Sequence, residues 1–125
     1  MEGLLNFARN RGIKGASFTA IGAFEKAELS FFDRRSKEYK PIPVEEQTEV
    51  LSFLGDIAIS DGEPKVHVHA VLGRSDGSCI GGDLKMGRVW PTLEVVLRET
   101  PMELRRELDR ESGLPLITGH SPSDK

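Results

Sequence analysis

The chain has 125 residues, of which 38% are hydrophobic and 30% charged, and its 17 Lys and Arg against 20 Asp and Glu give a net charge of −3. This length suits one domain with one core, and the negative balance argues against a protein that binds naked DNA through a basic surface. No apolar run reaches the ~20 residues of a membrane span, and the N-terminus lacks the pattern of a secretory signal. We therefore expect a cytoplasmic protein without a membrane partner.

The first predicted element is a short helix over residues 4–11, where leucine and alanine recur at helical spacing before Gly12. The segments that follow are rich in small, β-branched and aromatic residues, which favour strands. The predicted strands cover residues 16–24, 28–33, 38–44, 49–59, 66–72, 78–84 and 92–98. Pro41 and Pro43 confine the third of these strands to a sheet edge, and Gly55 indicates a bulge or bend in the fourth.

A second helix is predicted near the end of the chain, because Thr100, Pro101 and Glu103 have the pattern of a capping box with proline at the first helical position. Residues 119–125 are expected to form a flexible tail. Consecutive strands joined by short turns are antiparallel, since parallel crossovers need a dozen or more residues. The sequence thus predicts one α+β domain, residues 1–118, with a mainly antiparallel sheet, a short N-terminal helix and a C-terminal helix.

Two histidines stand out in the predicted strand over residues 66–72. His67 and His69 lie two residues apart, so their side chains share one face of the strand, while Val68 and its alternate neighbours face the core. Two imidazoles at this spacing can converge on one metal ion with bonds of about 2.0–2.1 Å. The alternative interpretation is a metal-free, hydrogen-bonded pair at a subunit interface, because H-x-H alone is a weak motif.

A third ligand would come from the next strand, where Asp83 is the candidate. A two-residue hairpin turn would place Asp83 on the wrong face, whereas a three-residue turn over residues 75–77 would bring it opposite His69. A bulge at Gly81-Gly82 would have the same effect as the longer turn. Asp83 could instead be an acid that bonds to backbone amides.

The same residues carry a resemblance to a known family. His67-Val68-His69, Ser75-Asp76-Gly77 and Gly81-Gly82-Asp83-Leu84 together resemble the H-x-H…D-G…G-G-H-L signature of the plant-and-prokaryote-conserved (PPC) domain, in its stand-alone prokaryotic type. Further segments that agree in order and spacing are Gly22-Ala23-Phe24, residues 49–55 and residues 94–97. The resemblance implies an α+β fold around an antiparallel sheet and a homotrimer. It also implies metal binding through the histidines, and in plant members the domain follows AT-hooks that bind A·T-rich DNA.

The chain departs from the family pattern at three places. Asp83 stands where the family has histidine, which converts three histidines into two histidines and a carboxylate. The family's opening strand is missing before the first helix, so either the sheet lacks an edge strand or the native start lies upstream of Met1. No Arg-Gly-Arg-Pro AT-hook is present.

Two functional hypotheses follow from these observations. The first is a trimeric binding or regulatory module that associates with DNA through protein partners rather than by a basic surface, with Zn or another divalent metal at His67, His69 and Asp83. The alternative is a metal-dependent enzyme of unknown reaction that uses the same two-His-one-carboxylate site. No catalytic residue can be named beyond those ligands, so the non-enzymatic hypothesis is preferred.

Overall fold

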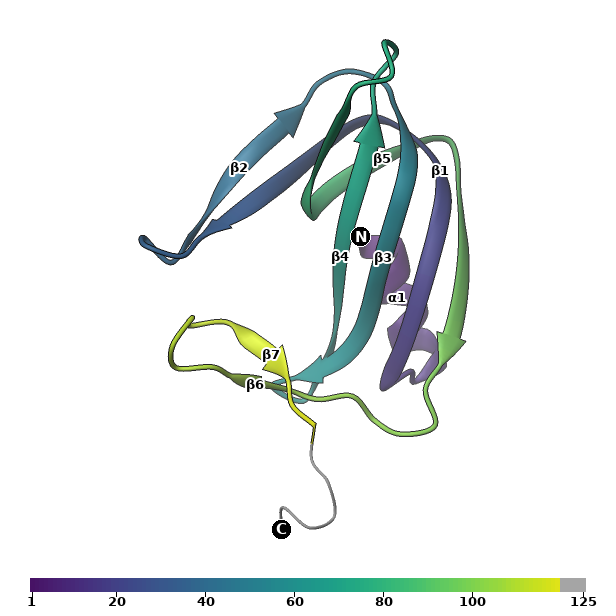
Figure 1. The fold of residues 1–125 in the computed structure, drawn as a ribbon. Coiled ribbons are helices and arrows are strands. Elements are labelled where there is room, and N and C mark those ends of the chain that lie inside the picture. Colours follow the sequence, from purple (N-terminus) through teal and green to yellow (C-terminus); the bar gives the residue numbers. More distant parts are fainter. Residues whose placement is uncertain (120–125) are drawn as a thin grey trace.

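The structure, a computed structural model, describes residues 1–119, and in these residues one helix precedes seven strands (Figure 1). Their bounds are α1 (Glu2–Arg11), β1 (Gly15–Asp33), β2 (Glu38–Val44), β3 (Thr48–Ser60), β4 (Glu63–Gly73), β5 (Cys79–Glu99), β6 (Arg106–Leu108) and β7 (Pro115–Ile117). The main sheet is antiparallel throughout, as predicted. No helix in this part of the chain is long and apolar enough to cross a membrane.

The main sheet has the strand order β2-β1-β3-β4-β5, and β5 also pairs with β1. This extra pairing closes β1, β3, β4 and β5 into a ring, because β5 is long enough to pair first with β4 and then with β1. The far end of β1 pairs with β2, which lies at the sheet edge as its two prolines predicted. Figure 1 shows this β1–β2 arm extending away from the ring, with the β6–β7 hairpin below it.

The core lies inside the ring, where α1 packs against it through the fully buried Ala8. Large side chains that are almost completely buried there include Phe24, Leu29, Phe53, Ile57, Val68 and Leu72. Gly12 ends α1 with a φ of 64°, and the neighbouring amide of Ile13 donates to the carbonyl of Ala8. Glycine favours this left-handed helix end because it has no Cβ to clash. The helix predicted over residues 4–11 is therefore confirmed, with two further residues at its start.

Two pairs of predicted strands are in fact single long strands. Residues 16–24 and 28–33 both belong to β1, and residues 78–84 and 92–98 both belong to β5. β1 continues through Gly22, which pairs with Val50 of β3 and with Leu93 of β5. A Cβ on Gly22 would lie 2.1 Å from the carbonyl oxygen of Thr92, so the close approach of β5 requires glycine there. The pairing register between β1 and β5 shifts next to this residue, as at a β-bulge.

The predicted C-terminal helix is wrong. The hydroxyl of Thr100 donates to the carbonyl of Met102 at 2.6 Å instead of capping a helix. The amide of Leu104 donates to the carbonyl of Lys14, and its carbonyl accepts from the amide of Ile59. These tertiary hydrogen bonds satisfy the backbone in an extended form, so the capping pattern does not prevail. The segment continues as the β6–β7 hairpin.

The predicted flexible tail over residues 119–125 lies, from residue 120 onward, outside the described residues.

Candidate metal centre

The turn between β4 and β5 decides where Asp83 lies. The amide of Arg74 donates to the carbonyl of Ser78 at 2.8 Å, so three residues form the turn. Asp76 holds it by accepting hydrogen bonds from the hydroxyl and amide of Ser78, which lower the pKa of the Asp76 carboxyl. The register then runs without a shift to the pair His69 and Asp83. Of the geometries left open by the sequence, the three-residue turn is the one that the chain adopts.

The glycines before Asp83 permit a close approach of strands rather than a bulge. A Cβ on Gly82 would lie 2.7 Å from the carbonyl oxygen of Ser30 in β1. Asp83 is itself paired with Ser30 in β1 and with His69 in β4, so it stands where β5 passes from one neighbour to the other. Its carboxylate is thereby held over the outer face of the ring, beside the histidines of β4.

The structure brings all three predicted residues together. One ligand atom from each of His67, His69 and Asp83 lies within 4.8 Å of the other two. Nε2 of His67 is 3.3 Å from Oδ2 of Asp83, and the two imidazole rings are 5.0 Å apart, edge to face. The Asp83 side chain is 11% exposed, whereas that of His67 is 40% exposed. The carboxylate of the cluster is therefore largely buried, whereas the imidazoles are accessible to solvent.

The charges around Asp83 favour its ionised form. Burial opposes ionisation, but the hydrogen bond from His67 and the positive charge of Lys85 outweigh it, and the pKa of Asp83 lies below its ordinary value. Lys85 lies 3.8 Å from the carboxylate and 3.7 Å from the ring centre of Tyr39. Burial and the Asp83 charge raise the pKa of Tyr39. Within residues 1–119, the carboxylate of Asp83 interacts with the side chains of His67 and Lys85.

Two residues beside the triad were not singled out from the sequence. Asp56 is the cross-strand neighbour of His67 on β3. Nη2 of Arg106 lies 2.7 Å from Oδ1 of Asp56 and 3.4 Å from Nδ1 of His67. Asp56 could have been found from the sequence, because it is a lone carboxylate among apolar strand residues. Arg106 carried no such signal, because its segment was predicted to be a helix.

The donor set fits a divalent metal ion. Metal bonds of about 2.0–2.1 Å at tetrahedral angles place ligand atoms ~3.3–3.4 Å apart. The 3.3 Å between His67 and Asp83 already matches this spacing. Two imidazoles and one carboxylate suit Zn and related transition metals, and they leave coordination positions for water or another ligand.

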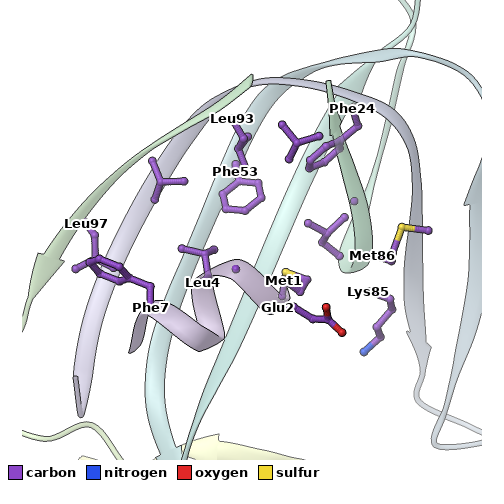
Figure 2. A pocket seen from close by; sticks show the side chains of 15 residues that line it. Met1, Glu2, Leu4, Phe7, Phe24, Phe53, Lys85, Met86, Leu93 and Leu97 are labelled. Carbon is purple, nitrogen blue, oxygen red and sulfur yellow. The ribbon is translucent and has the colours of Figure 1, made fainter. Parts of the chain in front are cut away.

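A mainly apolar cavity of about 670 Å³ adjoins the triad. Its aromatic and aliphatic walls are formed by Phe31, Phe32, Tyr39, Leu54, Val71 and Leu114. A second cavity, of about 880 Å³, lies between α1 and the ring, and Figure 2 shows Leu4, Phe53 and Leu93 around it. Among the described residues, Glu2 and Lys85 contribute charged side chains to the lining of the second cavity. Ligand sites combine apolar walls with a few convergent polar groups, so the triad's cavity is the stronger candidate site.

Comparison with known proteins places this geometry in context. The sequence profile of the Plants and Prokaryotes Conserved (PCC) domain matches residues 1–101. A PPC protein from Pyrococcus horikoshii is 32% identical and superposes with a TM-score of 0.89, covering 96% of this chain and 83% of its own. No curated protein sequence matches the chain significantly.

Two further solved structures are similar. A protein from Archaeoglobus fulgidus described as metal-containing is 33% identical, with a TM-score of 0.86, over 94% of this chain and 84% of its own. A protein from Bacteroides thetaiotaomicron named "a putative dna binding protein" is 27% identical, with a TM-score of 0.89, over 94% of this chain and 82% of its own.

Proposed function

Because the chain belongs to the Plants and Prokaryotes Conserved domain family, we propose that it is a trimeric binding and regulatory module that holds a divalent metal ion on its outer sheet face. The observation that carries the metal assignment is the convergence of His67, His69 and Asp83 within 4.8 Å. The A. fulgidus relative, described as metal-containing, supports it. Zinc is the first candidate, because two imidazoles and a carboxylate form a common zinc donor set.

Metal analysis tests this assignment. Purified protein is loaded with Zn²⁺, freed of excess by gel filtration and analysed for metal. We expect about one zinc per chain, and a large loss in His67→Ala and His69→Ala because each removes one of three ligands. His120→Ala is the matched control, since it removes the third histidine of the chain, which is not one of the three proposed ligands. Equal zinc content in all four proteins would refute the assignment.

The trimeric state is supported by apolar side chains on the same outer face. Leu54 and Val96 are each more than half exposed. The register aligns Val96, Thr19, Leu54, His69 and Asp83 in one row across neighbouring strands. Exposed apolar side chains in such a row are typical of association surfaces. Closed symmetric assembly would cover them and bring the triad close to a subunit boundary.

The link to DNA is proposed to run through partner proteins. The net charge of −3 gives the chain little long-range attraction for phosphates. We expect no binding of A·T-rich or random duplexes in a fluorescence anisotropy titration, even at low salt. Tight binding that weakens steeply with added salt would instead show direct phosphate contacts and overturn the indirect route.

The alternative function, a metal-dependent enzyme, gains no specific support. Two charged side chains near the triad have protein partners: Lys85 contacts Asp83 and the Tyr39 ring, and Arg106 bonds to Asp56.

A further inference from the structure

Arg106 occupies a position that bears directly on metal binding. It comes from β6, five residues beyond the segment that the family profile matches. Its side chain is only 9% exposed, and its guanidinium reaches Asp56, Nδ1 of His67 and the carbonyl oxygen of Pro115. A guanidinium carries five N–H donors and no acceptor, and it stays protonated in proteins. Whatever it touches at hydrogen-bond distance must therefore accept.

This contact favours one tautomer of His67. Nδ1 of His67 faces the Nη2 donor of Arg106 at 3.4 Å, and only a ring with a lone pair on Nδ1 can accept a hydrogen bond from it. In the neutral ring the proton then sits on Nε2, which lies 3.3 Å from the Asp83 carboxylate and donates to it. Both ring nitrogens of His67 are thus used by protein groups.

Metal ligation needs the opposite arrangement. A histidine that binds metal through Nε2 carries its proton on Nδ1, and it usually donates that proton to a carboxylate or a carbonyl. Here Nδ1 faces a cationic donor. A suitable acceptor lies next to it, because Asp56 is the cross-strand neighbour of His67, but Arg106 holds that carboxylate at 2.7 Å.

We infer that Arg106 is a positioning residue that holds the metal centre in a closed, metal-free form, and that metal binding displaces its guanidinium from His67. The inference rests on the proposed metal-binding function. In the metal-bound form His67 changes tautomer and Nδ1–H donates to Asp56. The ligand is a divalent cation such as Zn²⁺, and the regulated step is its entry.

The displacement couples the metal centre to the C-terminal hairpin. Arg106 bonds to Pro115 across the β6–β7 pair, and the loop between these strands contacts the β1–β2 arm where Nζ of Lys37 donates to the carbonyl of Glu111. We therefore expect a movement of the guanidinium to shift the β6–β7 hairpin and the β1–β2 arm, which both border the triad's cavity. A partner that pulled the hairpin away would favour metal uptake.

Two measurements test the inference. Long-range ¹H–¹⁵N NMR identifies the protonated nitrogen of His67 in the wild type, and we expect Nε2–H without metal and Nδ1–H after addition of Zn²⁺. Chelator competition measures zinc affinity, and we expect Arg106→Met to bind Zn²⁺ about 10–100-fold more tightly, the usual range for groups that orient a metal-binding histidine. Arg105→Met is the matched control, because within residues 1–119 the guanidinium of Arg105 pairs with Glu103 and not with the triad. This variant is expected to leave the zinc affinity unchanged.

The outcomes separate this inference from the proposed function. Nδ1–H in the metal-free wild type, or equal zinc affinity in the wild type and Arg106→Met, overturns the role of Arg106 while leaving the metal site intact. No zinc binding by either protein overturns both. If Asp56 accepts the hydrogen bond from Nδ1–H of His67 in the metal-bound form, the double variant Arg106→Met/Asp56→Ala loses the gain in zinc affinity. Retention of the full gain would contradict this role of Asp56.

Discussion

Gly55 illustrates how a single position in this sheet is constrained by its neighbours. It lies in the middle of β3, where the sequence indicated a bulge or bend, and its pairing with β1 and β4 is regular there, without a bulge. The register shift lies instead near Leu51, between Val50 and Ser52. A Cβ on Gly55 would approach the Phe18 ring and the His67 carbonyl oxygen to 2.5 Å. The glycine is therefore needed for close packing.

We predict that Gly55→Ala destabilises the protein by about 1–3 kcal/mol, the usual cost of forcing an extra carbon into a packed core. Phe18 has little room to move, because it is buried against Phe53 with 5.8 Å between ring centres. Urea unfolding followed by circular dichroism measures the change. Gly3→Ala in α1 is the control: nothing lies within 4 Å of its added Cβ, and it is expected to stabilise by about 0.5–1 kcal/mol. Equal stability of Gly55→Ala and the wild type would contradict the packing argument.

Asp33 has a different role, at the exposed turn between β1 and β2. Its carboxylate accepts hydrogen bonds from Lys40 and from the amides of Arg35 and Ser36, and these lower its pKa from 3.8 to about 2. The folded-state pKa lies below the unfolded value, so the stabilising contribution is present above pH 3.8 and is lost as the pH falls toward 2.

NMR titration of the carboxyl carbons is expected to give a pKa of about 2 for Asp33 in the wild type. Lys40→Met should raise this pKa toward 3.8, because the lysine hydrogen bond is the largest contribution to its lowering. Lys65→Met is a control that removes one positive charge elsewhere in the chain. An unchanged Asp33 pKa in Lys40→Met would show that the hydrogen bonds from the turn amides alone lower the pKa.

Individual site residues differed in how far the sequence could predict them. His67 and His69 followed from strand alternation, because adjacent apolar residues showed which face is buried. Asp83 depended on whether the turn has two or three residues, and composition does not distinguish these lengths when both contain Asp-Gly. Arg106 could not be predicted at all. Its contact with His67 exists only because the C-terminal segment forms a hairpin.

At the scale of elements, local signals succeeded where neighbouring residues alone decide the conformation. The helix stop at Gly12 and the edge strand with Pro41 and Pro43 are of this kind. The C-terminal capping box failed because Leu104 and its neighbours find hydrogen-bond partners at the ends of β1 and β3. The sequence predicted two strands each in place of β1 and β5 for a related reason. The bend within each strand looks like a strand end in the sequence, but in the closed ring the residues before and after the bend both pair with the other strand.

The edge strand β2 allows an element-scale prediction. Pro41 and Pro43 pair with Ser30 and Glu28 of β1. Each proline removes a backbone N–H donor, and because the two lie two residues apart, both missing donors are on the same side of the strand. We expect the double variant Pro41→Thr/Pro43→Thr to associate further through the outer edge of β2, because restored donors make it a template for strand pairing. Light scattering and thioflavin fluorescence after incubation would show the larger species. Pro64→Thr, at the start of β4, is the control. If the double variant forms no larger species than the wild type does, the prolines do not act by preventing edge-to-edge association.

On the scale of the whole molecule, the ring places two kinds of surface side by side. The row from Val96 through Leu54 to His69 joins exposed apolar side chains to a proposed metal ligand on a neighbouring strand. The ring requires β1 to lie between β3 and β5, so residues more than 40 apart in sequence meet on one face. The sequence alone could not show this juxtaposition, because it follows from the pairing of β1 with β5.

The row predicts that assembly depends on Leu54. The wild type is expected to show about three times the 13.8 kDa chain mass in size-exclusion chromatography with light scattering. Leu54→Glu should shift the mass to that of one chain, because a carboxylate in an apolar contact loses its hydration. Its far-ultraviolet circular dichroism should not change, since Leu54 is 57% exposed within the single chain and surface substitutions rarely alter folding by more than about 0.5 kcal/mol.

Leu108→Glu makes the same chemical change on β6, where the leucine is 70% exposed and lies outside the row, so its mass should equal that of the wild type. A wild type that remains a single chain at micromolar concentration would refute the trimer. A trimer that persists in Leu54→Glu would place the subunit contact elsewhere on the ring, and the metal centre would then face solvent rather than a neighbouring chain.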